Sequence, residues 1–464
     1  MRTILLAGVA VLGVVPATLS PARAQLQTEY PYTPPAGTTP VATPGVGTAI
    51  SNYTTNPPLT TSNATVRLAG RLGAIYAAVS DSGRNNPSLN GSKLANYQFY
   101  EYARLYPSFD AVAGNGLKYG AFLEIRADNP AAAGGAATGP SISASNNTRG
   151  ALYYRRETGY FGTDTLGYLR YGATDQPTAL FITGTMENFN SGGWNGDTSF
   201  FTGNTVPTWP FEDVGNLYTT TKVVYVSPKF SNLLDFGISY EPGTGGAGGA
   251  TNGNCPVAQT GCDALSSSPT ASDAARRRNT IDAVLRARTA IGQVGVAATL
   301  GTIQSGNIQY NGTTPPSVGP YDGLNVIDVG LQATYGGFAV GGHFLSGRVN
   351  GQWALVPSGG RDAVAYVAGA SYAFGPAIVG VQFFNYQSAG AWTRQASGVA
   401  RSRNEYGIAT GGTLTVAPGV FVFLGYLYGH RHQAGVDLLT GATGVSSNNN
   451  TRAQAISLAT QFRW

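Results

Sequence analysis

The end of the chain alternates in hydrophobicity up to its final residue. Large apolar side chains stand at Ile456, Leu458, Phe462 and Trp464, two or four residues apart. A period of two predicts a β-strand with one apolar face. The ends of soluble domains are usually frayed and polar, whereas the last strand of an outer-membrane barrel must close the sheet with one face in lipid. The ending therefore favours a transmembrane antiparallel β-barrel.

The composition agrees with a wall that has lipid on one side and water on the other. Charged residues make up 11% of the chain, against about 25% in ordinary soluble domains. The mean hydropathy is nevertheless only -0.06, because Gly, Ser, Thr, Asn and Gln supply the polarity. Alternating apolar and polar faces average in this way. The formal net charge of +5 is too small to argue for a nucleic-acid partner.

The first residues have the pattern of a secretory signal peptide. Arg2 precedes the apolar run 4–15, and the small-x-small sequence 22–24 follows it; we expect cleavage after Ala24, which removes residues 1–24. A membrane anchor is the alternative, but the run is shorter than the about 20 residues that a spanning helix needs. Residues 25–63 are rich in Pro and Thr and are predicted to form a flexible arm, with the barrel over 64–464.

Cys255 and Cys262 are the only cysteines. In an exported chain such a close pair predicts a local disulfide that fixes a loop. A metal site would need more ligands, and no histidine lies nearby in the sequence. His430 and His432 are two residues apart, but no third ligand is evident. The sequence therefore predicts no metal and no cofactor.

From Thr65 onward, alternation predicts an even number of strands, as single-chain bacterial barrels have. The sixteen predicted strands are 65–79, 97–109, 116–127, 149–161, 164–172, 218–227, 232–241, 278–290, 292–302, 326–335, 338–347, 361–373, 377–387, 403–416, 419–431 and 452–464. Tight turns alternate with long connections, which is typical of periplasmic turns and outer loops. A soluble sheet of hairpins is the alternative, but it does not explain the signal peptide, the low charge and the aromatic end together.

Charged and apolar side chains separate onto opposite faces of these strands. In 116–127, for example, Glu124 and Arg126 lie opposite Leu123 and Ile125. A charge that faces lipid at the midplane costs about 2–4 kcal/mol, so the charged face is predicted to line the lumen. The expected basic residues of the pore wall are Arg67, Arg71, Lys118, Arg126, Arg170, Arg286 and Arg288, accompanied by Glu124 and Asp282.

One long connection, 173–217, differs from an ordinary surface loop. It contains two tryptophans and several phenylalanines, which a solvated loop has little reason to hold. Packed inside the barrel, it would set carboxylates against arginines across a water-filled constriction, and such charges determine pore selectivity. An aromatic-rich outer cap is the alternative. The acidic residues expected on the constriction are Glu187, Asp197, Glu212 and Asp213.

Four short stretches, in order and spacing, resemble the general bacterial porins. They are 114–118, 160–167, 224–230 and 370–377, and the resemblance covers about residues 65–464. It implies a sixteen-stranded, trimeric channel of the Gram-negative outer membrane. It also implies that the loop after the fifth strand, here 173–217, folds inward, and that Arg170 faces the pore. The loop departs from the family's acidic Pro-Glu-Phe type sequence, although 186–189 is near it, and the arm 25–63 lies outside the pattern.

Together these patterns predict a porin for passive diffusion of small hydrophilic solutes and ions. The excess of arginine on the wall predicts a weak preference for anions. A substrate-specific channel for sugars or anions is the alternative. No Ser-His-Asp set or carboxylate pair can be singled out, so no enzyme is expected. The expected partners are outer-membrane lipid, lipopolysaccharide and two further copies of the chain.

Overall fold

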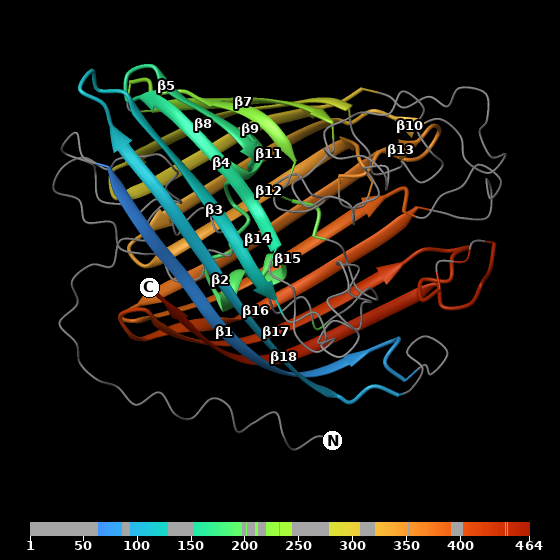
Figure 1. The fold of residues 1–464 in the computed structure, drawn as a ribbon. Helices are drawn as coiled ribbons and strands as arrows, with labels where there is room; N and C mark the ends of the chain where they lie inside the picture. The colour runs from blue at the N-terminus through green and yellow to red at the C-terminus, as the bar shows by residue number, and fades with distance from the viewer. Residues whose placement is uncertain are drawn as a thin grey trace, which may run out of the picture.

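The chain forms a closed antiparallel β-barrel of sixteen strands (Figure 1). The computed structural model describes residues 64–85, 93–128, 153–196, 201, 209–211, 220–231, 233–243, 278–306, 321–350, 353–390, 402–440, 442 and 444–464. Each strand of the barrel pairs with the next one along the chain, and β1 pairs with β18 to close the ring.

The strands have the following bounds. They are β1 Thr65–Asp81, β2 Tyr97–Val112, β3 Lys118–Asp128, β4 Tyr153–Thr163, β5 Gly167–Ala173, β6 Thr221–Val226, β7 Leu234–Gly243, β8 Arg278–Ile291, β9 Val294–Gln304, β11 Asn325–Tyr335, β12 Phe338–Arg348, β14 Ala363–Phe374, β15 Ala377–Ser388, β16 Arg403–Ala417, β17 Val420–His432 and β18 Asn450–Arg463.

All sixteen predicted strands are confirmed, with boundaries that differ by a few residues. At the start of β4, the predicted residues 149–152 lie outside the described part of the chain. The sequence did not predict the small sheet in which β10 (Tyr321–Asp322) pairs with β13 (Val356–Pro357). Strands of two residues are too short to show an alternation, so only their contact in space reveals them.

The two faces of the barrel differ as the alternation predicts. On β18, Ile456 is 57% exposed and Leu458 is 53% exposed, whereas Ser457 between them is buried, as is Gln461 further along the strand. Exposed Leu, Ile, Val, Tyr and Phe side chains recur in the same way on the other strands. The outward face is therefore apolar, and the inward face carries the polar and charged groups.

The last residues of the chain seal the barrel. Gly70 and Trp464 exchange two backbone hydrogen bonds, with N···O distances of 3.1 and 3.2 Å. Phe462 pairs with Leu72 of β1 on one side and with Val420 of β17 on the other. The strand that ends the chain is therefore also the seam of the sheet, as the terminal alternation indicated.

Deletion of residues 462–464 should lower assembly of the barrel strongly. The truncation removes two of the residue pairs that join β18 to β1, together with the backbone bonds between Gly70 and Trp464. It leaves unpaired backbone groups where lipid offers them no hydrogen bonds. The amount of heat-modifiable barrel in the outer membrane measures this, with Trp464→Phe as the control that keeps every backbone bond. Normal levels of the truncated chain would contradict the sealing role of these residues.

Short turns and long connections alternate round the barrel. Four turns predicted from the sequence, at 227–230, 335–338, 374–376 and 417–419, join the ends of consecutive strands. The turn predicted at 161–164 lies at 164–166 instead, because β4 continues to Thr163. Within the described residues, no helix has both the length and the apolar character needed to cross a membrane.

The long connection between β17 and β18 is organised round one carboxylate. Asp437 accepts hydrogen bonds from the backbone N–H groups of Leu439 and Thr440 at 2.9 and 3.1 Å. The Ser447 hydroxyl and the Asn448 amide donate to its other oxygen at 2.9 and 2.8 Å. Burial acts to raise the pKa of Asp437, but these donors outweigh it and lower the pKa to about 2.

This connection should loosen in acid. Because the pKa of Asp437 is lower in the folded state than its ordinary value near 3.8, its contribution is complete above about pH 4 and is lost as the pH falls toward 2. Asp437→Asn should make residues 433–449 more accessible to a protease at pH 7. Asp362→Asn, at an exposed position of another connection, is the control. Equal cleavage of the two variants would contradict the organising role of Asp437.

Candidate functional site

A segment that follows β5 lies along the inner face of the barrel wall. It runs from Thr174 to Gly196 and includes the short helix α2 (Pro177–Leu180) and the 3-10 turn η3 (Asn190–Asn195). Nearly all its residues are buried. It contacts β7 and β8 at α2, and β15, β16 and β17 at η3. We call residues 174–196 the inner segment.

Side chains from three strands, β8, β14 and β15, hold the inner segment by hydrogen bonds. Asp282 of β8 accepts from the backbone N–H and the hydroxyl of Thr178, at 3.0 and 2.9 Å. Gln382 of β15 donates to the Thr185 carbonyl at 2.5 Å and accepts from the backbone N–H of Trp194 at 3.1 Å. Ser371 of β14 accepts from Asn188 in a hydrogen bond of 2.8 Å. The segment is therefore attached to the wall at several points.

Glycines make room on the wall for this segment. A Cβ atom at Gly380 would overlap the ring of Phe189, and one at Gly425 would overlap the amide of Asn190. The same holds for other inward-facing glycines against other residues of the segment. They are Gly237 against Phe181, Gly330 against Thr183, Gly341 against Gly184 and Gly407 against Trp194. Six strands of the wall thus lack a side chain where the segment passes.

Aromatic side chains fill the space between the inner segment and the wall. Trp194 meets Phe384 of β15 edge to face, with ring centroids 5.8 Å apart. Trp209 contacts the same ring at 5.3 Å, and Phe211 lies 5.4 Å from the ring of His343 on β12. All these rings are buried. Such edge-to-face pairs stabilise packing by about 0.5–1.5 kcal/mol each beyond the area they bury.

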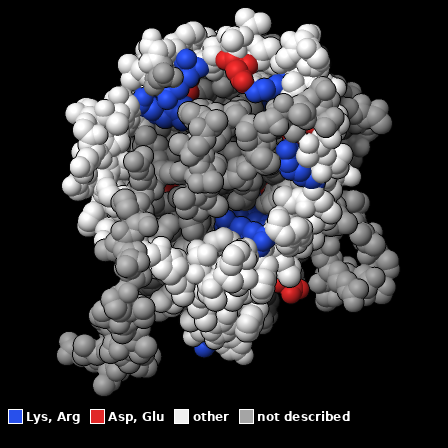
Figure 2. Space-filling view, turned by 90° about the vertical axis from the view of Figure 1, so that its left-hand side faces the viewer, with Lys and Arg blue, Asp and Glu red and all other residues white. Residues whose placement is uncertain are grey.

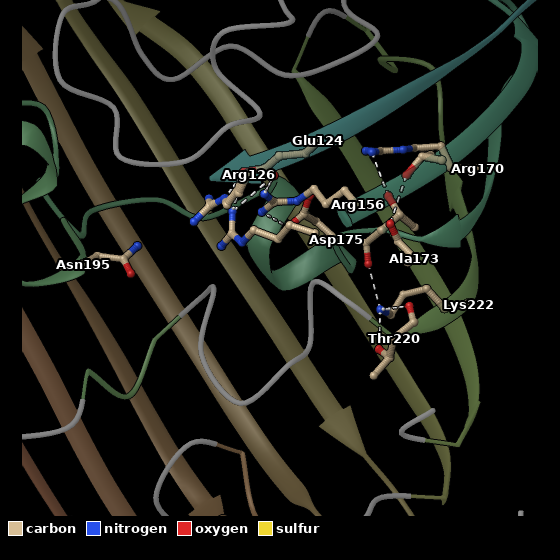
Figure 3. A network of polar contacts seen from close by, with 12 residues as sticks. Glu124, Arg126, Arg156, Arg170, Ala173, Asp175, Asn195, Thr220 and Lys222 are labelled. Atoms are coloured by element: carbon tan, nitrogen blue, oxygen red, sulfur yellow. Dashed lines mark hydrogen bonds and ion pairs between the residues drawn. The ribbon is translucent and has the colours of Figure 1, made fainter. Parts of the chain in front are cut away.

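A cluster of arginines surrounds Glu124 on β3 and β4 (Figure 3). Arg126 donates to Glu124 at 2.5 Å, Arg155 lies 3.3 Å from it, and Arg156 also donates to it. Arg156 in addition forms a two-point ion pair with Asp175, at 2.7 Å for both bonds. Because Asp175 is at the start of the inner segment, this cluster ties the segment to the wall. We call these five residues the Glu124 cluster.

A β-bulge produces the unusual density of arginine in this cluster. Glu124 pairs with Arg156, but the next residue, Ile125, pairs with Tyr154, so the register skips Arg155. Successive residues of a regular strand point to opposite faces. At the bulge, both Arg155 and Arg156 are buried, with relative exposures of 8% and 1%. Two consecutive guanidinium groups therefore reach the same carboxylate.

The structure places most of the predicted basic residues on the inner face, in contact with acids or with aromatic rings. Arg67 pairs with Asp110, and Arg286 and Arg288 both pair with Asp235, at 2.5 and 2.8 Å. Arg71 lies over the ring of Tyr102, and Arg170 lies over that of Phe122 and donates to Thr174. The charge of the wall is thus more balanced than the predicted arginine excess implied.

Lys118 is at the end of the barrel and not in the middle of its wall. It is the first residue of β3 and pairs with Asp164 of the β4–β5 turn at 2.7 Å. Burial acts to raise the pKa of Asp164, but hydrogen bonds from Lys118 and Tyr168 lower it below its usual value. Figure 2 views the barrel from the end that carries the C-terminus and shows Lys and Arg side chains at several places round this rim.

Of the four acids predicted on the constriction loop, the structure describes Glu187. It is buried and accepts a hydrogen bond of 3.0 Å from Asn195 of the same segment. Asp197, Glu212 and Asp213 lie outside the described residues, as do Cys255 and Cys262 and the segments 1–24 and 25–63. No group of three or more metal-ligating side chains occurs among the residues described.

Several charged residues of the inner face were not predicted. Asp110, Asp235, Arg104 and Glu405 have inward positions in strands, and their alternation with apolar neighbours could have identified them. Arg155 could not be found in this way, because the bulge shifts the alternation there. Asp175 lies just after β5, where no period applies, so only its ion pair with Arg156 identifies it.

The family model of the Gram-negative porins matches residues 36–434. No curated protein sequence matches the chain. Among solved structures, the outer-membrane channel DcaP of Acinetobacter baumannii is 12% identical with a TM-score of 0.50, covering 87% of this chain and 99% of its own.

Two further solved structures are similar to a comparable extent. The anion-selective porin from Comamonas acidovorans is 14% identical with a TM-score of 0.49, over 87% of this chain and 100% of its own. OmpT of Vibrio cholerae in its trimer form is 12% identical with a TM-score of 0.47, over 86% of this chain and 99% of its own.

Proposed function

Because this chain belongs to the Gram-negative porin family and is a channel of the outer membrane, we propose that it lets small hydrophilic solutes and ions diffuse passively through a water-filled lumen. The observation that carries this proposal is the inner face itself. The inner face carries charged and polar side chains and the outer face is apolar, as an aqueous channel in lipid requires.

The inner segment is the proposed constriction of this channel. It lies against the wall from β7 round to β17, and its contacts with wall glycines and with Gln382 fix its path. A segment that occupies the lumen narrows the cross-section open to solutes. The rest of the predicted loop 173–217, with Asp197, Glu212 and Asp213, is proposed to complete it. In this arrangement the loop faces the basic residues of β1 to β5.

The charge pattern supports a weak preference for anions. The Glu124 cluster has three guanidinium groups and two carboxylates. Arg104 and Arg170 lie on the neighbouring strands β2 and β5, and Arg71 lies on β1. The pairs with Asp110 and Asp235 reduce the excess. Charged groups that line a narrow pore determine which ions enter it. The preference should therefore favour chloride over potassium modestly.

Conductance of the purified protein in planar bilayers tests the proposal. A passive porin should show a current proportional to salt concentration, without saturation by any one solute. In a KCl gradient, the reversal potential should have the sign of chloride selectivity. Clear potassium selectivity would refute the anion preference, and saturation by a sugar or phosphate would indicate a substrate-specific channel instead. Absence of conductance from folded barrels would refute the proposed function.

The remaining expectations belong to the same proposal. A homotrimer should give conductance steps in groups of three. The exposed apolar side chains of the outer face are proposed to contact outer-membrane lipid, with lipopolysaccharide on the side of the long connections.

Residues 1–24 are proposed as a signal peptide and 25–63 as an arm outside the barrel. A disulfide between Cys255 and Cys262 is expected, and a thiol count before and after reduction checks it.

A further inference from the structure

His343 of β12 joins the barrel wall to the inner segment. Its Nδ1 atom lies 2.9 Å from the carbonyl oxygen of Thr183, which belongs to the inner segment. Its Nε2 atom lies 3.3 Å from a carboxylate oxygen of Asp328 on the neighbouring strand β11. His343 and Asp328 are each 3% exposed, and Thr183 is 5% exposed. The imidazole therefore stands between two oxygen atoms in a site shielded from bulk water.

Glycines on two strands make the space for this contact. A Cβ atom at Gly330 of β11 would overlap the Thr183 carbonyl and lie 2.8 Å from Nδ1 of His343. A Cβ atom at Gly301 of β9 would overlap a carboxylate oxygen of Asp328. The ring of Phe211 covers the imidazole at 5.4 Å, nearly perpendicular to it. Backbone, glycines and aromatic ring thus shape the site round the three polar groups.

A neutral imidazole at His343 cannot donate a hydrogen bond to both of its oxygen partners. A backbone carbonyl accepts and cannot donate, and an ionised carboxylate likewise only accepts. A neutral imidazole has one N–H donor, whereas an imidazolium has two. With one extra proton in the His343–Asp328 pair, whichever of the two holds it, both contacts become hydrogen bonds. Without that proton, one of the two contacts brings two acceptor atoms together with no hydrogen between them.

We propose that His343 is a positioning residue that holds the inner segment on the wall in a proton-dependent way. In acid, the His343–Asp328 pair carries the extra proton, and His343 is hydrogen-bonded to both Thr183 and Asp328. As the pH rises, the proton leaves, one bond is lost, and the segment near Thr183 is held less firmly. This inference rests on the proposed function, in which the inner segment narrows the channel.

Within the part of the chain that the structure describes, few charged or titratable groups lie near His343. From β11 it faces Asp328, and beyond β9 lies Asp282, which interacts electrostatically with Asp328. From β14 the paired residue is Val367, and the inner segment offers the carbonyl of Thr183. Phe211, from the loop that follows, offers a ring and no charge. Asp282 also binds Thr178, so protonation here acts on one continuous stretch of the segment.

Conductance measured as a function of pH tests this inference. The single-channel conductance of the wild-type protein should change across a pH series, as the His343–Asp328 pair gains or loses its proton. His343→Gln and Asp328→Asn should each remove this change. The chain has two other histidines, His430 and His432, so the double variant His430→Gln/His432→Gln is the control and should keep it. An unchanged pH profile in His343→Gln would overturn the inference.

Hydrogen exchange of the wild-type protein keeps the test independent of variants that fail to assemble. After correction for the intrinsic effect of pH, amides of residues 178–186 should exchange about fivefold faster at pH 8 than at pH 5, as expected for the loss of one hydrogen bond. Equal protection at both values would overturn the inference. A channel that conducts without this pH dependence refutes only the role of His343, whereas folded barrels that do not conduct refute the proposed function.

Discussion

Glu124→Gln should destabilise the barrel by about 3–5 kcal/mol and make the channel more selective for anions. Glu124 is fully buried and is the carboxylate that Arg126, Arg155 and Arg156 share. Glutamine has the same size but no charge, so the substitution leaves the packing and removes the charge that balances the guanidinium groups. Urea unfolding in lipid vesicles measures the first effect, and the reversal potential in a KCl gradient measures the second.

Asp164→Asn provides the matched control for this experiment. It also removes a carboxylate that pairs with a cation, but Asp164 is in a turn with its side chain 59% exposed. Exposed ion pairs contribute only about 0–1 kcal/mol. The control should therefore unfold nearly as the wild type does. If the two variants were equally stable, the Glu124 cluster would not hold the barrel and the inner segment together.

The sequence predicts the barrel well because period two is a local property of each strand. Every side chain on a lipid-facing wall must obey it, so the sixteen strands and the face of Ile456, Leu458 and Phe462 could be predicted from the chain alone. The seam between β1 and β18 followed from the same pattern. What the period cannot give is register, and register decides which charged side chains meet.

The balance of charge on the inner face shows this limit. Arg286 and Arg288 are both buried on the inward side of β8, but their shared partner Asp235 comes from β7 and depends on the pairing of β7 with β8. Arg155 faces inward only because of a bulge. The predicted excess of arginine therefore counted the side chains on one face. The electric field in the lumen depends on which carboxylates pair with these arginines.

The path of the inner segment depends on glycines of the wall. These glycines can be seen in the sequence, but their role cannot. Glycines occur in most of the strands, and nothing in their local sequence distinguishes Gly380 or Gly425 from glycines that face lipid. Only the structure reveals that several of them face residues 177–194. Because each belongs to a different strand, their common role arises from the closed barrel.

Gly425→Val should displace the inner segment and raise the single-channel conductance. Any Cβ at this position would overlap the side-chain amide of Asn190, which is itself fully buried at the η3 turn. Valine is well suited to a β-strand, so β17 should still form. The cost of overpacking, about 1–3 kcal/mol, then acts mainly on the contact between the strand and the segment.

Gly342→Ala is the control for the effect of adding a side chain to a glycine of the wall. Gly342 faces outward on β12, and the nearest atom to an added Cβ is a backbone oxygen at 3.1 Å, with no atom of the inner segment near it. Its conductance should equal that of the wild type. If Gly425→Val assembles normally and also conducts as the wild type does, then residues 190–194 do not limit the flow. The narrowest part of the channel would then lie elsewhere, because a displaced segment that changes no current cannot be the constriction.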